Sequence, residues 1–544
     1  MDVSIGTIWE AVCRALPDAV AIVEPGRELT YREFDDRASR LAAALEEAGV
    51  RAGDTVACYL YNGAAYLETV FAAFKLGAVP ANANYRYTGE ELSELLTDAD
   101  AAAVVFSGAL ADRVTHAAGH VRTLKLLVRA GDLPAEGPTG PAVPELEELL
   151  AKHAPREARP RPGSDRLFMY TGGTTGKPKG VMWQLGDLLH SIPILRQAGV
   201  TELPKTLDEF AATAVAAHRE GRAPTTMPVV PLMHATGLFN TMGTLLVGGR
   251  AVMARQGGLD PAHVWQSLAE REIDTLLVAG NAVCRPLVDE LVRAEGADEP
   301  YDLRSLRTVI SSGTALDDRL KKALHERADV TVVDAIASSE GGPFALGITS
   351  SVRELPTRFR PVPAARVIGE GDRFVEPGSG ETGNLAYCGP MPLGYYKDTG
   401  KSARTFRTIE GVRYAIPGDL AQIEADGAIR FLGRGSGVIN TGGEKVHPQE
   451  VEDVLLTHPE VTDCVVVGVP DETWGERVAA VVAVGSAATV TGEELRDWVR
   501  RGLAGYKVPR SVVLREALPR TPTGKLEIAW ARATAQNAGA AAGG

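Results

Sequence analysis

The chain has 544 residues, of which 45% are hydrophobic and 23% are charged, and its formal net charge is −13. One hydrophobic core rarely serves a chain of this length, so several domains are expected. The negative charge argues against broad binding to nucleic acid or anionic membranes, and the sequence contains no apolar run of about 20 residues that could span a bilayer.

The cysteines and the two ends of the chain indicate a cytoplasmic protein with reduced thiols and a flexible tail. The five cysteines are dispersed and include no CxxC pair, which is typical of reduced thiols in a cytoplasmic protein without a zinc site. Residues 1–20 lack the continuous apolar run of a signal peptide. Residues 533–544, which end in "AQNAGAAAGG", indicate a flexible tail.

The first part of the chain alternates helical and strand-like segments. Residues 30–49 predict a helix, because Thr30 and Glu33 have the spacing of a capping box and Gly49 provides a stop. The alternation predicts parallel sheets of the α/β class. The strand-like segments are residues 54–61, 101–107, 124–130, 166–170, 250–254, 275–280, 306–313 and 330–336.

The second part predicts a different organisation. Glycine-rich turns between short strands over residues 375–433 indicate a small β-subdomain, and a compact pattern of helices and strands follows. Gly435, Ser436 and Gly437 supply the backbone freedom that a hinge needs, although a simple turn would use the same residues. We therefore predict an α/β fold with a large N-terminal domain (1–433) containing parallel sheets and the β-subdomain, a hinge (434–437), a small mobile α+β C-terminal domain (438–532) and the tail.

Residues 170–180, "YTGGTTGKPKG", have the composition of a phosphate-binding loop. The mononucleotide P-loop is excluded, because only three residues separate Gly172 from Gly176, and Pro178 follows Lys177. Glycines let backbone N–H groups approach an anion, and hydroxyl and ammonium groups add hydrogen bonds and positive charge. The candidate phosphate-binding residues are Thr171, Gly172, Gly173, Thr174, Thr175, Gly176 and Lys179.

This loop resembles that of the adenylate-forming enzymes, the superfamily of acyl-CoA synthetases, adenylation domains and luciferases. Six further segments resemble motifs of that superfamily in its order, and the resemblance covers nearly the whole chain. It is closest to bacterial fatty-acyl and steroid-side-chain CoA ligases. The segments are "PLMHATG" (231–237), "SSGTAL" (311–316), "DAIASSE" (334–340), "YAIPGDL" (414–420), "GRGSGVINTGGEKVHPQEVE" (433–452) and "PRTPTGKLE" (519–527).

The resemblance assigns roles to individual residues. It implies that Lys525 is the catalytic lysine, that Glu340 binds Mg²⁺ and that His234 borders the reacting carboxylate. It implies a hinge at Ser436 and contacts with CoA from Gly442, Gly443 and Lys445, although a solvated surface lysine is an equally good interpretation of Lys445. Beyond the phosphate loop, the ATP-binding residues that it implies are Gly313, Thr314, Ala315, Asp334, Ile336, Ser339, Asp419 and Arg434.

Four residues depart from the pattern of many relatives. Ile336 and Ala337 replace an aromatic residue and a glycine, so adenine would pack on an aliphatic surface. Pro417 replaces a threonine, which removes a hydroxyl group, and Ser436 replaces a charged residue at the hinge. None of these departures removes a group to which the resemblance assigns a catalytic role.

The leading hypothesis is an ATP-dependent acyl-CoA synthetase that uses Mg²⁺ and CoA and activates a hydrophobic carboxylic acid. A second hypothesis keeps the adenylation step but changes the acceptor to a carrier-protein thiol or an amine, or changes the acid to another oxyanion such as nitrite. A third is a non-catalytic nucleotide sensor. The expected partners are small molecules and, at most, a second copy of the chain, with no nucleic acid and no stable membrane insertion.

Overall fold

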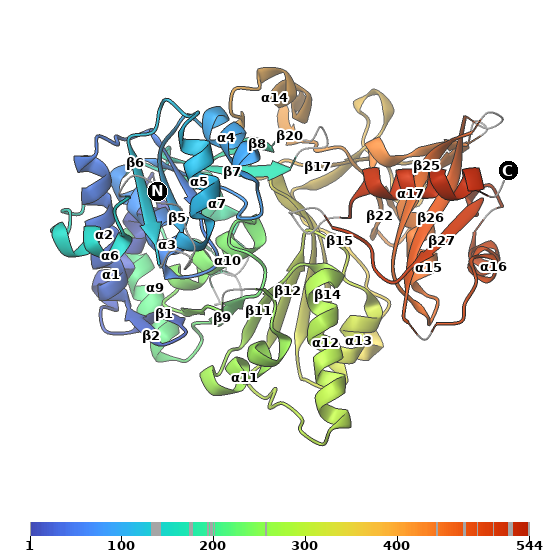
Figure 1. Cartoon of the computed structure of the whole chain (residues 1–544), viewed down its shortest axis with the longest axis horizontal. Helices are drawn as coiled ribbons and strands as arrows, with labels where there is room; N and C mark the ends of the chain where they lie inside the picture. The colour runs from blue at the N-terminus through green and yellow to red at the C-terminus, as the bar shows by residue number, and fades with distance from the viewer. Residues whose placement is uncertain are drawn as a thin grey trace. The chain divides into compact units, whose positions relative to one another are not determined.

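The computed structural model describes residues 2–131, 143–172, 178–192, 195, 200, 202–255, 258–441, 444–471, 475–486, 488–503, 505–520 and 526–541 (Figure 1). The chain divides into two compact units. Unit 1 comprises Met1–Ala364 and Tyr387–Ala415, and unit 2 comprises Ala365–Ala386 and Ile416–Gly544. Residues 416–433 therefore group with the C-terminal part of the chain, whereas the sequence predicts a boundary at 434–437. The hinge itself stays a prediction.

Unit 1 contains a seven-stranded sheet in the order β18-β8-β7-β4-β3-β5-β6. The run from β7 to β6 is parallel, and β8 and β18 extend it in antiparallel fashion. The strands are β3 (Thr55–Tyr59), β4 (Val79–Asn82), β5 (Ala101–Ser107), β6 (Leu126–Ala130), β7 (Arg166–Gly172), β8 (Pro178–Gln184) and β18 (Gly394–Tyr395).

A second sheet of unit 1 has nine strands in the order β15-β14-β13-β12-β11-β9-β10-β1-β2. Its six central strands, from β13 to β1, are parallel. The strands are β1 (Val20–Glu24), β2 (Arg27–Thr30), β9 (Thr225–Pro228), β10 (Arg250–Val252), β11 (Thr275–Val278), β12 (Thr308–Ser312), β13 (Thr331–Ser338), β14 (Gly341–Thr349) and β15 (Arg360–Pro361).

Helices bury both faces of these sheets, as parallel strands require. One core contains apolar residues of α1, α2, α3 and α10, a second lies under α4 and α5, and a third under α11, α12 and α13. The helices of unit 1 are α1 (Ile5–Ala15), α2 (Tyr31–Glu47), α3 (Ala64–Leu76), α4 (Gly89–Asp98), α5 (Ala111–Ala118), α6 (Leu146–Lys152), α7 (Leu185–His190), α9 (Leu207–Arg219), α10 (Ala235–Leu246), α11 (Pro261–Arg271), α12 (Gly280–Gly296), α13 (Asp318–His325) and α14 (Thr399–Thr405).

The predicted capping box of α2 is confirmed. The Thr30 hydroxyl accepts a hydrogen bond from the Glu33 N–H at 3.2 Å, and the Glu33 carboxylate accepts one from the Thr30 N–H at 2.8 Å. Such a pair satisfies two N–H groups that have no partner inside the helix.

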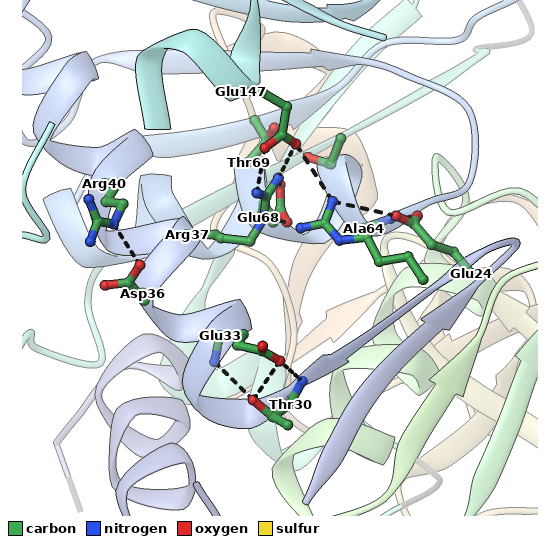
Figure 2. A network of polar contacts seen from close by, with 12 residues as sticks. Glu24, Thr30, Glu33, Asp36, Arg37, Arg40, Ala64, Glu68, Thr69 and Glu147 are labelled. Carbon is green, nitrogen blue, oxygen red and sulfur yellow. Dashed lines mark hydrogen bonds and ion pairs between the residues drawn. The ribbon is translucent and has the colours of Figure 1, made fainter. Parts of the chain in front are cut away.

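Buried charges of unit 1 are paired across helices. Figure 2 shows Arg37 of α2 directed at Glu68 of α3 and Glu147 of α6, with Nε of Arg37 lying 2.6 Å from Oε1 of Glu68 and Nη2 lying 2.5 Å from Oε1 of Glu147. Only 1% of the Glu68 side chain is exposed, and its burial raises the pKa of its carboxyl while Arg37 opposes that rise. A buried carboxylate is tolerated when it is paired in this way, so the network ties three helices together.

Unit 2 combines a small antiparallel sheet with a mixed sheet. In the first, β17 (Gly383–Tyr387) pairs with β16 (Ala365–Ile368) and β21 (Asp419–Ile423), and β21 pairs with β22 (Ile429–Arg434). In the second, β26 (Gly475–Val484) pairs with β25 (Val461–Asp471), with β27 (Ser511–Arg515) and with β23 (Ile439–Thr441), which in turn pairs with β24 (Glu444–Val446). Helices α15 (Pro448–Leu456) and α16 (Gly492–Gly502) pack on one face of this sheet, and α17 (Ile528–Ala541) packs on the other.

The α/β class predicted from the sequence is confirmed, with parallel sheets in the large part and an α+β arrangement near the C-terminus. Helix α17 covers residues 533–541 of the segment in which the sequence predicts a flexible tail, and the flexibility of that segment stays a prediction. Ala531 and Ala535 are fully buried against strands of unit 2, and this packing extends the helix into a segment whose small residues suggested a loose end. Within the described residues, no helix is both long and apolar enough to cross a membrane.

The remaining strands of unit 1, β19 (Phe406–Ile409) and β20 (Val412–Ala415), form an antiparallel hairpin. Together with the small sheet of unit 2, they correspond to the short strands that the sequence predicted over residues 375–433. All five cysteines are free thiols, and four of them are buried.

Candidate active site

The predicted phosphate loop lies between two paired strands. β7 and β8 form an antiparallel hairpin in which Thr171 is opposite Lys179 and Gly172 is opposite Pro178. Nζ of Lys179 lies 3.5 Å from Oδ2 of Asp398, and both side chains are about a quarter exposed. The hairpin thus places a hydroxyl and an ammonium group at the base of the loop. Gly173, Thr174, Thr175 and Gly176 lie outside the described residues.

Glu340 lies between β13 and β14 and is surrounded by hydroxyl groups. The hydroxyls of Ser338 and Ser339 donate to Oε2 of Glu340 at 2.5 and 3.0 Å, and the Tyr395 hydroxyl donates to Oε1 at 2.7 Å. The Glu340 residue is only 7% exposed. These hydrogen bonds fix the position of both carboxylate oxygens.

The donor set around Glu340 fits a magnesium ion that is held mainly by its substrate. Among the described residues there is no group of three or more His, Cys, Asp or Glu side chains that could hold a metal. Mg²⁺ is commonly bound by one or two carboxylates while water and substrate phosphates complete its six positions. A single carboxylate therefore matches the role that the resemblance assigned to Glu340, and that role stays a prediction.

Tyr395 is a site residue that sequence analysis did not identify. Its ring is buried, and Nζ of Lys401 lies 4.1 Å from the ring centroid. Tyr395 is separated from Glu340 by 55 residues, so no local pattern connects the two. The glycine and two tyrosines at 394–396 provide the only sequence signal, and a structural core would give the same one.

The β8 strand also contacts the Glu340 segment. The indole N–H of Trp183 donates to the Ser339 carbonyl at 3.0 Å, and Trp183 itself is buried. This bond fixes the backbone beside Glu340 relative to the phosphate-loop hairpin. Ser339, predicted to bind ATP, thereby contacts both the hairpin and Glu340.

Residues 313–315 form a turn after β12 that rests on the start of α12. The Thr314 hydroxyl donates to the Ala279 carbonyl at 3.2 Å, and the Asn281 N–H donates to the Ala315 carbonyl at 2.9 Å. Gly280 has a φ of +51°, and a Cβ atom there would lie 2.2 Å from Oγ1 of Thr314. Only glycine permits this close approach, so the local sequence fixes the position of the turn.

Two predicted ATP-binding residues lie on β13. Ile336 is half-buried, whereas Asp334 is buried and its Oδ2 lies 2.8 Å from Nζ of Lys321, which is itself only 1% exposed. Burial raises the pKa of Asp334 to about 6, and Lys321 opposes that rise. The Asp334 carboxylate is therefore engaged by a protein cation, and its predicted contact with ATP stays a prediction.

His234 precedes helix α10 as its N-cap residue. The His234 N–H donates to the Pro231 carbonyl at 3.0 Å, which closes a tight turn before the helix. A Cβ atom at Gly237 would lie 2.6 Å from the same carbonyl oxygen, so this turn requires glycine. The "PLMHATG" segment thus presents a half-buried histidine at a helix start.

Asp419 and Arg434 lie opposite each other on β21 and β22 of unit 2. Nε of Arg434 is 2.7 Å from Oδ1 of Asp419, and the Arg434 guanidinium also donates to the Pro417 carbonyl at 3.2 Å. The Asp419 side chain is 8% exposed and that of Arg434 is 45% exposed. The structure thus brings together two residues to which the resemblance assigned a role in ATP binding, and that role stays a prediction.

The remaining predicted residues of unit 2 are only partly described. Ser436 lies in a short 3₁₀ turn, Gly435–Gly437, and the backbone of Lys445 belongs to β24. The predicted catalytic residue Lys525 and the predicted CoA contacts Gly442 and Gly443 lie outside the described residues. Their roles stay predictions.

Comparison with known proteins identifies the class. The sequence model of the AMP-binding enzyme family matches residues 9–396, and that of the AMP-binding enzyme C-terminal domain matches residues 450–525. The chain belongs to the AMP-binding enzyme family.

Two curated relatives are similar over nearly their whole length. The 3-oxocholest-4-en-26-oate–CoA ligase of Rhodococcus rhodochrous is 36% identical over 538 residues, which cover 98% of this chain and 96% of the relative. A medium/long-chain-fatty-acid–CoA/3-oxocholest-4-en-26-oate–CoA ligase of Mycobacterium tuberculosis is 37% identical over 539 residues, which cover 97% and 95%. The crystal structure of the anthranilate CoA ligase AuaEII with anthranoyl-AMP superposes with a TM-score of 0.82 at 23% identity, covers 99% of this chain and 98% of its own, and supports the fold.

Proposed function

We propose that this chain is an ATP-dependent acyl-CoA synthetase for a hydrophobic carboxylic acid. It joins the acid to AMP with release of pyrophosphate and then transfers the acyl group to CoA. The observation that carries the proposal is 36% identity over 98% of the chain to a relative named as a CoA ligase. The substrate class follows from the names of the two relatives, which specify a steroid-side-chain acid and medium- and long-chain fatty acids.

In the first half-reaction, an oxygen of the substrate carboxylate attacks the α-phosphorus of ATP and the bond to pyrophosphate breaks. Both reactants are anions, so the site must hold them together and neutralise charge at phosphorus. Thr171 and Lys179, at the ends of the phosphate-loop hairpin, bind the phosphates together with the residues between them. A Mg²⁺ ion, held by Glu340, would lower the charge on the phosphate oxygens when bound.

The nucleoside is held by backbone and by paired side chains. Residues 313–315 and Ile336 line the adenine, which packs on an aliphatic surface. Asp419 accepts hydrogen bonds from the ribose hydroxyls, and its ion pair with Arg434 supports this role because it brings two residues of the resembling motifs together. Asp334 contributes by anchoring β13 to Lys321, because its carboxylate already has a cationic partner.

The acid lies beside His234, and the second half-reaction needs a rearranged site. Lys525 stabilises the charge at phosphorus during adenylation. A rotation at Ser436 then withdraws Lys525 and brings Gly442, Gly443 and Lys445 to the pantetheine arm of CoA. The CoA thiolate attacks the acyl carbonyl, and AMP leaves as the C–O bond to its phosphate breaks.

The test measures products with a panel of acids. Purified protein is incubated with ATP, Mg²⁺, CoA and short-chain, long-chain, aromatic or steroid-side-chain acids, and nucleotides and thioesters are quantified. The proposal predicts equal amounts of AMP, pyrophosphate and acyl-CoA with a hydrophobic acid, and a rate lower by a factor of about 100 to 1,000 in Lys525→Ala. Adenylation with every acid but no transfer to CoA would instead indicate an amine or carrier-protein acceptor and would overturn the CoA step.

A further inference from the structure

A buried asparagine joins two of the segments that the reaction uses. Asn82 is the last residue of β4 and is 7% exposed. Its Nδ2 donates to the carbonyls of Tyr170 at 2.9 Å and Met233 at 2.7 Å, and its Oδ1 accepts from the Tyr170 N–H at 2.6 Å. Both N–H bonds and the carbonyl oxygen of this amide are therefore used.

The partners of Asn82 place it between the two sheets of unit 1. Tyr170 immediately precedes Thr171 on β7, the strand that leads into the phosphate loop. Met233 immediately precedes His234, in the segment 229–234 between β9 and α10, which we call the β9–α10 segment. β7 belongs to the seven-stranded sheet and β9 to the nine-stranded sheet. One side chain thus contacts two residues that lie 88 and 151 positions further along the chain.

Two of the three hydrogen bonds have an ordinary structural explanation. β4 pairs with β7 through Ala81 and Phe168 and ends at Asn82. The amide of Asn82 accepts from the N–H of Tyr170 and donates to its carbonyl, as the backbone of a longer β4 would do. The bond to Met233 has no part in this strand pairing, because it leads to the other sheet.

A second asparagine supports the same segment. Nδ2 of Asn62, which follows β3, donates to the carbonyls of Pro228 at 3.0 Å and Val230 at 3.2 Å, and its Oδ1 accepts from the Leu232 N–H at 2.7 Å. Two amides from the seven-stranded sheet therefore hold the backbone around the β9–α10 segment at four points. Side-chain amides do this without adding charge to a place where two anions meet.

We propose that Asn82 is a positioning residue that fixes the spacing between the phosphate-loop strand and the His234 segment. The inference rests on the proposed function, in which ATP is held at the first segment and the acid at the second. The carboxylate must lie within near-contact distance of the α-phosphorus, and a displacement of about 1 Å can cost about 100-fold in rate. Asn82 contacts neither substrate and acts through the backbone of Tyr170 and Met233.

The test compares Asn82→Ala with a matched control in unit 1. The control is Thr244→Val, which removes a buried hydrogen bond of 2.8 Å between the Thr226 and Thr244 hydroxyls. That bond joins β9 to α10, the two elements that flank the β9–α10 segment, but does not reach the seven-stranded sheet. Acid-dependent ATP–pyrophosphate exchange gives kcat, equilibrium dialysis gives the Kd for ATP, and calorimetry gives Tm.

For Asn82→Ala we expect kcat to fall by about 10- to 100-fold while the Kd for ATP changes less than about twofold, because each substrate keeps its own contacts. Thr244→Val should lower Tm and leave kcat within about twofold of wild type. A folded Asn82→Ala protein with wild-type kcat overturns the inference. If wild type itself forms no acyl-AMP with any acid, the proposed function fails instead, and the two failures are distinguishable.

A second variant covers the case in which Asn82→Ala does not fold. Asn62→Ala releases the same segment at Pro228, Val230 and Leu232 and leaves the Tyr170 bonds intact. As for Asn82→Ala, we expect kcat to fall while the Kd for ATP stays unchanged. A wild-type kcat in folded Asn62→Ala would show that the spacing does not depend on these amides and would overturn the inference.

Discussion

Removal of the Tyr395 hydroxyl tests how Glu340 is held. In Tyr395→Phe, the ring keeps its buried position beside Phe406 and Lys401, and the hydrogen bond of 2.7 Å to Oε1 of Glu340 is lost. The two serine hydroxyls remain on Oε2. The substitution therefore releases one oxygen of the carboxylate without removing the carboxylate.

The size of the effect follows from the type of bond. A hydrogen bond to a charged group contributes about 1.5–3 kcal/mol, and about 1.4 kcal/mol corresponds to a factor of ten. Because two of the three hydroxyl donors to Glu340 remain, we expect the lower end of this range, a loss of about tenfold in kcat/KM for adenylation. We also expect a higher Mg²⁺ concentration for half-maximal rate and weaker binding of Mn²⁺ by the protein–ATP complex.

The neighbouring tyrosine provides a matched control. The Tyr396 hydroxyl donates to Oδ2 of Asp100 at 2.8 Å, so Tyr396→Phe removes the same kind of bond from an exposed carboxylate outside the site. Acid-dependent ATP–pyrophosphate exchange over a Mg²⁺ titration and Mn²⁺ binding by electron paramagnetic resonance compare the two variants. The reasoning is refuted if Tyr395→Phe matches Tyr396→Phe in both measurements.

Two further predictions concern buried charges. Lys321→Met leaves the buried Asp334 carboxylate without the ammonium group of Lys321. The substitution should lower the free energy of unfolding by about 3–5 kcal/mol at pH 7.5. Burial raises the pKa of Asp334 to about 6, so the stability that its neutral form provides is complete below its ordinary pKa and is lost as pH rises through about 6. Thermal unfolding should therefore show that Lys321→Met loses less stability relative to wild type at pH 5 than at pH 7.5. An equal loss of stability at the two pH values would contradict this. Arg37→Met should likewise lower the free energy of unfolding by about 3–5 kcal/mol, because its partner Glu68 is 1% exposed. The control is Arg32→Met, whose ion pair with Asp18 is exposed and whose loss should lower it by less than about 1 kcal/mol. Equal losses of Tm in the two variants would contradict this prediction.

The sequence predicted those parts of the fold that local signals determine. The capping box at Thr30 and Glu33 fixes the start of α2. Strand β5, Ala101–Ser107, has the predicted bounds because a short apolar run between helices leaves little freedom. The extent of helix α17 is not given by a local signal, since its end is rich in alanine and glycine. Burial of Ala535 against other strands extends the helix, and that contact has no local signature.

The same distinction applies to the candidate site. Motif order identified Glu340, Asp419 and Arg434, because each lies in a short segment with a recognisable pattern. It could not identify Tyr395 or Asn82, whose partners are 55 to 151 residues away. Their hydrogen bonds arise from the order of strands in the sheets, and tyrosine or asparagine in a buried segment has many other uses. The sequence therefore predicts candidate residues that lie in short recognisable segments better than residues whose contacts depend on the order of the strands.

In the proposed function, the protein activates an acid by attaching AMP to it. The most direct measurement is exchange of labelled pyrophosphate into ATP without CoA, together with chromatographic identification of the nucleotide formed when CoA is added. We expect exchange that requires the hydrophobic acid, followed by one AMP for each acyl-CoA. Exchange that does not depend on the acid, or accumulation of ADP in place of AMP, would contradict it.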